Sequence, residues 1–199
     1  MPDLELEAKA KGCGYNFICG VDEAGRGPLA GPVCAAAVIL PEGAELEGVN
    51  DSKKLSEKKR EALFDLITEK ALAYSIAFAS VEEIEKYNIL EATHIAMNRA
   101  IDGLSHKADF ALIDGNRVPK GISVPCETVV KGDSKSLSIA AASILAKVTR
   151  DRLLLQYHEE YPQYNFAKHK GYGTKEHIDA IREHGVCEIH RPSFLKKLI

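Results

Sequence analysis

The apolar residues of this chain fall into short runs that suit β-strands and longer runs with helical spacing. Short stretches rich in β-branched and apolar residues predict five strands, at 16–21, 31–40, 71–79, 109–113 and 124–130. Apolar residues at three- and four-residue intervals predict helices at 56–69, 89–104, 137–157 and near 174–184, with a short helix after Ser80. The alternation of strands and helices along the chain predicts an α/β fold.

Two helix starts and one buried helix can be predicted in more detail. Ser56 and Ser80 each precede a helical pattern and suit the N-cap position, because a serine hydroxyl accepts a hydrogen bond from a free amide of the first turn. The helix from Leu137 is rich in alanine and isoleucine at its start, so we expect it to be buried against the sheet. No repeat, low-complexity tract or linker marks a firm domain boundary.

Composition narrows the class of protein. A chain of 199 residues that is 45% hydrophobic suits one compact domain with a buried core. No apolar run approaches the roughly 20 residues that a membrane helix requires, and the acidic start lacks the features of a secretory signal. Five scattered cysteines favour free thiols in a reducing compartment over a disulfide framework. We therefore expect a cytoplasmic protein that makes no use of a membrane.

Charge is distributed unevenly along the chain. The net charge of −3 argues mildly against nucleic-acid binding. Between Arg117 and Arg152, however, the sequence contains seven basic residues and only three acidic ones, and the segment 50–60 is rich in lysine. These regions predict either an electropositive face or, equally simply, solvated helix starts with ordinary surface lysines.

Carboxylates follow the predicted strands at separate points of the chain. Asp22 and Glu23 come directly after the first strand, Asp114 follows the strand that ends at Ile113, and Asp133 precedes the long helix. Each alone is most simply a turn residue or a helix cap. Together, at the ends of separate elements of one sheet, they supply the oxygen ligands that a hard divalent cation requires. The pattern predicts a Mg²⁺ or Mn²⁺ site, and a pair of such ions about 4 Å apart can hydrolyse a phosphodiester.

The adjacent pair raises a geometric problem. Consecutive residues of a regular strand point to opposite faces, so Asp22 and Glu23 cannot both reach one site if the strand continues through them. We predict that the strand ends at or just after Asp22, with Gly25 and Gly27 supplying unusual backbone torsions.

Six segments resemble, in order, the motifs of the ribonuclease HII family. The first is GVDEAGRGPLAGPV at 20–33, and the others lie at 51–55, 114–116, 131–134, 138–151 and 169–174. The resemblance implies the ribonuclease H-like fold, an α/β architecture with a central mixed β-sheet flanked by helices and a small C-terminal helical appendage. We accordingly expect an N-terminal extension without a role at 1–12, the catalytic domain at 13–160 and a packed helical segment at 161–199.

The same resemblance implies an activity and a set of catalytic residues. It makes Asp22, Glu23, Asp114 and Asp133 the catalytic carboxylates that bind two metal ions. It implies endonucleolytic hydrolysis of the RNA strand of RNA–DNA hybrids, and cleavage 5′ to single ribonucleotides in duplex DNA, leaving 3′-hydroxyl and 5′-phosphate ends. We expect the enzyme to act as a monomer.

Substrate contacts follow from the resemblance and from simple chemistry. Glycines let the main chain approach a nucleic acid closely, and the 2′-hydroxyl distinguishes RNA from DNA. By resemblance, Gly25, Arg26 and Gly27 read that hydroxyl, and Tyr172 stacks on the deoxyribose beyond a ribonucleotide. Weaker candidates for phosphate contacts are Lys53, Lys54, Ser143 and Lys147. For Ser143 and Lys147, helix packing and surface solvation explain the residue equally well.

Several alternatives compete with this interpretation. Ribonuclease HIII shares the carboxylates but carries Gly-Lys-Gly at the Gly25 motif, and a non-catalytic binding module would not need to keep all four acids. A zinc site formed by His177, His184, Cys187 and His190 is disfavoured because no paired ligand motif supports it. His169 remains a weak candidate for a role near the active site. The segment 194–199 is expected to pack on the domain rather than bind a partner.

Overall fold

A mixed five-stranded sheet forms the centre of the molecule. The computed structural model describes residues 1–50, 52–196 and 198, so Asp51 of the second motif and two residues of the segment 194–199 lie outside it. The sheet order is β3-β2-β1-β4-β5, with β1 antiparallel to β2, β2 antiparallel to β3, and parallel pairing of β1 with β4 and of β4 with β5. The strands are β1 (Ile18–Ala24), β2 (Val33–Ile39), β3 (Ala73–Ala79), β4 (Phe110–Asp114) and β5 (Cys126–Val129).

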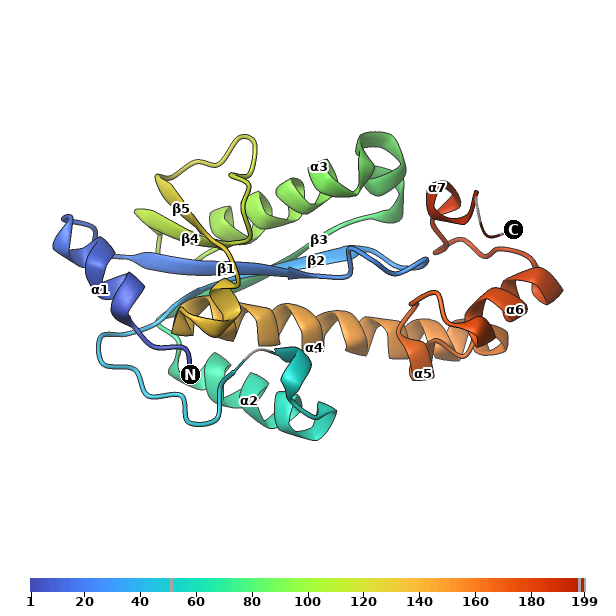
Figure 1. Cartoon of the computed structure of the whole chain (residues 1–199), viewed down its shortest axis with the longest axis horizontal. Helices are drawn as coiled ribbons and strands as arrows, with labels where there is room; N and C mark the ends of the chain where they lie inside the picture. The colour runs from blue at the N-terminus through green and yellow to red at the C-terminus, as the bar shows by residue number, and fades with distance from the viewer. Residues whose placement is uncertain (51, 197, 199) are drawn as a thin grey trace.

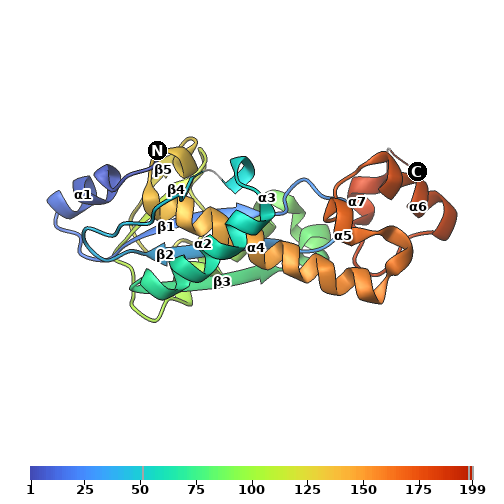
Figure 2. The same ribbon diagram turned by 90° about the horizontal axis from the view of Figure 1, so that it is seen from below.

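Helices cover both faces of this sheet. Helix α3 lies on one face, and α4 with α2 lies on the other, while α5, α6 and α7 gather beyond one end of the sheet (Figures 1 and 2). The α-helices are α1 (Glu5–Gly12), α2 (Glu57–Lys70), α3 (Val81–Asp102), α4 (Leu137–Glu160), α5 (Phe166–His169), α6 (Lys175–His184) and α7 (Pro192–Leu195). Short 3₁₀ turns are η1 (Ser52–Lys54), η2 (Gly132–Ser134) and η3 (Pro162–Tyr164). The predicted α/β architecture is confirmed.

Helix α3 joins the two helices that were predicted separately. Ser80 caps it through its side chain, as predicted, and Glu83 completes a capping box. Asn88 then interrupts the helix with a φ of 71°, and its Oδ1 accepts the amides of Leu90 and Glu91. The break between the two helical patterns therefore lies where the sequence predicted it. Asn88 causes the break, because asparagine tolerates this torsion and caps the second segment.

Helix α4 packs directly on the middle of the sheet because Gly20 leaves room for it. A Cβ atom added at Gly20 would lie 2.2 Å from the backbone nitrogen of Ile139. On the neighbouring strand, Ala35, Ala36 and Ala37 are fully buried and equally small. The close approach brings side chains of α4 over the end of β1, where the carboxylates lie.

The C-terminal helices have an apolar core of their own. Leu154 from the last turns of α4 packs with Tyr164, Phe166 and Ile181, and Leu195 closes the cluster. Phe194 and Leu198 are partly buried against it, as expected for a packed C-terminal segment. Among the residues that the structure describes, no helix has the length and apolarity to cross a membrane.

The N-terminal segment has a structural role that the sequence did not reveal. Residues 5–12 form α1, and Glu7 is buried at the start of α4. Its Oε1 accepts the hydroxyl of Ser136 at 2.6 Å and, from Ser138, the hydroxyl at 2.5 Å and the amide at 3.1 Å. The backbone of Asp3 also pairs with Lys135 and Leu137. The expectation that residues 1–12 have no role is therefore wrong, because Glu7 caps the longest helix.

We expect Glu7→Ala to lower the free energy of unfolding by about 1–3 kcal/mol, since it leaves buried hydroxyl and amide donors of α4 unsatisfied. Urea unfolding at neutral pH measures this change. Glu5→Ala is the matched control, because Glu5 is exposed on the same helix and should shift stability by less than about 0.5 kcal/mol. Equal stability of both variants would contradict the capping role.

Candidate active site

A cleft of about 210 Å³ lies where β1, η1 and α4 meet. It brings together nine of the twelve residues that the sequence analysis proposed for the site. These are Asp22, Glu23, Gly25, Arg26, Gly27, Lys53, Ser143, Lys147 and Tyr172. Asp114 lines an adjoining cavity of about 80 Å³, which Glu23 and Arg26 also line. Lys54 is exposed on η1 next to the cleft, and Asp133 lies in η2.

Strand β1 does not end at Asp22, so the prediction of an early strand end is wrong. Its pairing with β2 continues regularly to Ala24, whereas its pairing with β4 stops at Val21. Beyond that point β1 has an open edge beside Asp114, the last residue of β4. The side chains of Asp22 and Glu23 therefore extend from opposite faces of one strand, but both lie at this open edge. Glu23 borders both cavities.

The glycines of the next turn behave differently from each other. Gly25 has a φ of 96°, in the region that favours glycine, whereas Gly27 has no positive φ. A Cβ atom at Gly25 would also lie 2.0 Å from Nε of Arg150. The prediction of unusual torsions is thus confirmed for Gly25 and wrong for Gly27.

Burial and mutual repulsion dominate the electrostatics of the carboxylates. Burial raises the pKa of Asp22 well above its usual value, and the charges of Glu23 and Asp114 raise it further. Burial also raises the pKa of Glu23, although Arg26, with a nitrogen 3.3 Å from Oε1, opposes this shift. Acids in this situation gain from a nearby cation, because it lets them ionise together.

Hydrogen bonds fix the orientation of Asp22. Its Oδ1 accepts the amide of Glu23 at 2.7 Å, and Ser143 contributes a side-chain hydrogen bond that lowers the pKa of Asp22. The hydroxyl of Ser143 lies 2.8 Å from that of Ser52. Ser143, proposed from the sequence as a phosphate contact, therefore positions a carboxylate, and Ser52 is a supporting residue that the sequence analysis missed.

Asp114 connects the end of β4 to the turn that carries Asp133. Its Oδ1 accepts the amide of Gly132 at 2.6 Å. Within the described part of the chain, no three His, Cys, Asp or Glu side chains are already grouped as a metal site. The convergence of all four acids on metal ions consequently stays a prediction. The donor set near β1 and β4 consists of carboxylate oxygens and suits a hard divalent cation.

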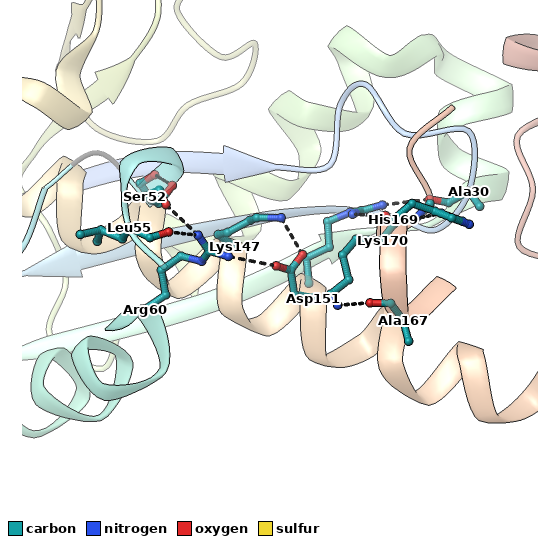
Figure 3. A network of polar contacts seen from close by, with 12 residues as sticks. Ala30, Ser52, Leu55, Arg60, Lys147, Asp151, Ala167, His169 and Lys170 are labelled. Atoms are coloured by element: carbon teal, nitrogen blue, oxygen red, sulfur yellow. Dashed lines mark hydrogen bonds and ion pairs between the residues drawn. The ribbon is translucent and has the colours of Figure 1, made fainter. Parts of the chain in front are cut away.

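A polar network attaches η1 to α4 beside the cleft (Figure 3). Arg60 donates from one nitrogen to the carbonyls of Ser52 at 3.0 Å and Leu55 at 2.6 Å, and its other terminal nitrogen lies 4.0 Å from Asp151. Lys147 donates to the same aspartate at 2.7 Å. The network holds the turn with Lys53 against the helix and occupies the ammonium group of Lys147.

Two buried arginines shape the backbone between β1 and β2, and the sequence analysis missed both roles. Arg191 donates to the carbonyls of Gly25 at 2.7 Å, Arg26 at 3.1 Å, Pro28 at 2.8 Å and Gly31 at 2.6 Å. Its guanidinium is fully buried, and this burial lowers its pKa to about 9. The carbonyl partners lie more than 150 residues away along the chain, so no local pattern indicates this clamp.

Arg150 acts in the same way from α4. It donates to the carbonyls of Ala30 at 2.9 Å, Pro32 at 3.1 Å and Lys170 at 3.0 Å, and so joins the loop after β1 to the loop that carries Tyr172. Helical spacing could have indicated its burial, since it lies midway between the buried residues 146 and 154.

Of the two alternatives for the basic segment between Arg117 and Arg152, the electropositive face loses part of its support. Arg150 is buried, Lys120 pairs with Glu91 at 2.7 Å, and Arg152 pairs with Glu61. Counting basic residues along the sequence overstated the free positive charge, because charges that are neighbours in sequence find separate partners in the fold.

Tyr172 stands across the cleft from the glycine loop. The residue is 44% exposed, and a Cβ atom at Gly27 would lie 3.8 Å from its ring. The carbonyl of Gly171 accepts the amide of Leu29 at 2.8 Å, which ties the two loops together. His169 is buried, with its ring bonded to backbone groups of Tyr164 and Gly171, and does not line the cleft.

The mixed sheet lies between α3 and α4, and the carboxylates lie where β1 extends beyond the end of β4. This combination is typical of enzymes of the ribonuclease H-like class, and solved structures of that class share the fold. The family model for ribonuclease HII matches residues 19–197. The chain belongs to the ribonuclease HII family, and its activity is that of a ribonuclease H endonuclease.

One curated relative supports this family assignment, and two solved structures show the same fold. Ribonuclease HII of Ruminiclostridium cellulolyticum is 58% identical over 196 residues, which cover 98% of this chain and 76% of that protein. The crystal structure of ribonuclease H2 from Pyrococcus horikoshii OT3 superposes with a TM-score of 0.76 at 26% identity, covering 92% of this chain and 97% of that one. Bst-RNase HIII in complex with Mn²⁺ shares the fold, with a TM-score of 0.66 at 18% identity over 85% of this chain and 63% of that one.

Proposed function

We propose that this ribonuclease cuts the RNA strand of RNA–DNA hybrids and also cuts 5′ to single ribonucleotides embedded in duplex DNA. The observation that carries the proposal is that Asp22, the Gly25–Gly27 loop and Tyr172 line one cleft. Groups suited to phosphodiester hydrolysis, to reading a 2′-hydroxyl and to stacking on the next sugar thus share one cleft, which supports their action on a single nucleotide step.

The chemistry assigned to the cleft depends on its acids. Two divalent cations, Mg²⁺ or Mn²⁺, held by Asp22, Glu23, Asp114 and Asp133, would supply the activated water and stabilise the leaving oxygen. The protein orients its own carboxylates in advance, since Ser143 holds that of Asp22 and the amide of Gly132 holds that of Asp114. Cleavage in this arrangement leaves 3′-hydroxyl and 5′-phosphate ends.

Recognition of the ribonucleotide is assigned to the backbone of the loop after β1. The Arg191 clamp bonds the carbonyls of Gly25 and Arg26, so the loop presents one fixed surface to a 2′-hydroxyl. Side chains that touch phosphates position the duplex without reading its sequence. We assign this contact to Lys53 and Lys54, which are exposed on η1, and give Lys147 a smaller part because Asp151 already binds its ammonium.

A cleavage assay tests the proposed function. The substrate is a DNA duplex with one ribonucleotide, and the enzyme is supplied with Mg²⁺ or Mn²⁺. We expect a single cut on the 5′ side of the ribonucleotide and none in an all-DNA duplex. A folded enzyme that cuts a continuous hybrid but leaves this duplex intact would refute the junction-directed part of the proposal.

Tyr172→Ala should separate the two substrates. We expect kcat/KM to fall about tenfold or more on the single-ribonucleotide duplex, because stacking on a sugar or base contributes about 1–3 kcal/mol, and to fall much less on a long hybrid. Tyr172→Phe is the control, since it keeps the ring and should retain most of the activity. Equal losses on both substrates would exclude a junction-sensing role for this residue.

We also propose a monomer that works in the cytoplasm. The five cysteines of the chain are free thiols, which a reducing compartment preserves. Light scattering at micromolar concentration, with and without duplex, tests the oligomeric state directly.

A further inference from the structure

Three buried histidines lie behind the loop that carries Tyr172, and the chemistry assigned to the cleft does not use them. His169 ends α5, His177 lies in α6, and His190 lies shortly before α7. His177 and His190 are 0% and 1% exposed. The rings of His169 and His177 stack with their centroids 4.4 Å apart. Such polar rings need hydrogen-bond partners to be stable in an apolar core.

The partners of His190 and His177 determine which ring nitrogen carries each proton. The amide of Cys187 donates to Nδ1 of His190 at 2.9 Å, so the proton of His190 lies on Nε2. This Nε2 is 3.0 Å from Nε2 of His177, which must accept. The proton of His177 therefore lies on Nδ1, which donates at 2.9 Å to the carbonyl of Tyr172. One chain of hydrogen bonds thus connects the backbone of residue 187 to that of residue 172.

All the hydrogen bonds of this series can form together only when both imidazoles are neutral. A second proton on His177 would place two donors face to face between the Nε2 atoms, and a second proton on His190 would place a donor on Nδ1 opposite the amide of Cys187. Burial favours the neutral forms and lowers the pKa of both His177 and His190 to about 4. At neutral pH the pair therefore has a single arrangement of protons.

The loop that receives this hydrogen bond depends on outside contacts for its shape. Tyr172 stands between Gly171, which has a φ of 83°, and Gly173, so its own segment adds little stiffness. The amide of Thr174 reaches the Tyr172 carbonyl at 2.8 Å from within the loop. His177 supplies the second bond to that carbonyl, from a helix packed in the apolar core.

We propose that His190 and His177 are positioning residues that hold the backbone of Tyr172, and with it the tyrosine ring, in place for the sugar beyond a ribonucleotide. The inference rests on the proposed function, in which Tyr172 senses an RNA-to-DNA junction. It predicts that loss of the hydrogen-bond chain weakens junction cleavage selectively.

Two substitutions at His177 test the proposal by steady-state kinetics on both substrates. His177→Phe keeps an aromatic ring but removes both hydrogen bonds, and should lower kcat/KM about tenfold on the single-ribonucleotide duplex and less than about threefold on a long hybrid. His177→Asn can still donate to the Tyr172 carbonyl from the position of Nδ1, and should recover most of the loss. His184→Asn, at the exposed end of the same helix, is the matched control and should match the wild type.

Tyr172→Ala distinguishes failure of this inference from failure of the proposed function. Equal losses for Tyr172→Ala on both substrates would remove the junction sensor itself. If Tyr172→Ala is selective but folded His177→Phe is silent, or loses both activities equally, the positioning role is overturned alone. Combining His177→Phe with Tyr172→Ala should cause no further loss beyond Tyr172→Ala, because His177 acts through Tyr172.

A measurement on the unmodified protein covers the case in which His177→Phe does not fold. Long-range proton–nitrogen NMR reports which nitrogen of each imidazole is protonated. We expect the proton on Nδ1 of His177 and on Nε2 of His190 at neutral pH. A proton on Nε2 of His177 would break the chain and overturn the proposal.

Discussion

Asp22→Asn is expected to abolish metal-dependent cleavage while leaving the protein folded. Asp22 lies at the open edge of β1 next to Glu23 and Asp114, and loss of its charge would remove a ligand of the proposed cation site. We expect kcat/KM to fall by at least about 10³-fold, equivalent to about 4 kcal/mol of transition-state stabilisation. Duplex binding, measured by fluorescence anisotropy, should largely survive, because backbone and phosphate contacts remain.

The same variant should be more stable than the wild type at neutral pH in the absence of metal. The folded protein raises the pKa of Asp22, so it binds this proton more tightly than the unfolded chain does. Stability of the wild type therefore falls as pH rises from the ordinary carboxyl pKa to the raised value. Asparagine avoids this loss, and its advantage in thermal denaturation should shrink as pH falls and disappear below about pH 4, where Asp22 is protonated in both the folded and the unfolded chain.

Addition of Mg²⁺ or Mn²⁺ should make the wild type more stable than Asp22→Asn. Metal binding stabilises the folded wild type by an amount that grows with the logarithm of free metal over its dissociation constant, and Asp22→Asn gains less because its site is weakened. Asp65→Asn, an exposed position on α2, is the matched control and should change neither activity nor the response to metal. Wild-type turnover in Asp22→Asn would show that the metal site lies elsewhere.

Arg191→Met is expected to produce the second large effect. It leaves the carbonyls of Gly25, Arg26 and Pro28 without the donor that holds them. Displacement of the loop by about 1 Å is enough to lower kcat/KM about 100-fold. The free energy of unfolding should fall by about 1–3 kcal/mol, a limited loss because removing a buried cation offsets part of the missing hydrogen bonds.

Arg191→Lys separates the charge from the hydrogen-bond geometry. Lysine keeps the positive charge but lacks the planar fork that reaches several carbonyls at once, so we expect it to lose nearly as much activity as methionine. Arg182→Met, on the exposed side of α6, should leave activity unchanged and shift stability by less than about 0.5 kcal/mol. Full activity of Arg191→Lys would indicate that the charge alone matters.

The sequence alone determined the elements and the chemical class of the site. Apolar periodicity predicted the five strands and the long buried helix, because side-chain spacing reflects local backbone geometry. Serine caps located the starts of α2 and α3 for the same local reason. The order of the motifs identified the family, and those motifs contain the residues that line the cleft.

Only the tertiary structure decided how Asp22 and Glu23 share one site. The alternation of side chains along a strand predicted an end between them, but β1 continues and its neighbour β4 ends instead. The burial of Glu7 under α4 and the clamps of Arg150 and Arg191 were equally out of reach. Each depends on partners more than 100 residues away, apart from the contact of Arg150 with Lys170, and such long-range contacts leave no periodic signal in a single sequence.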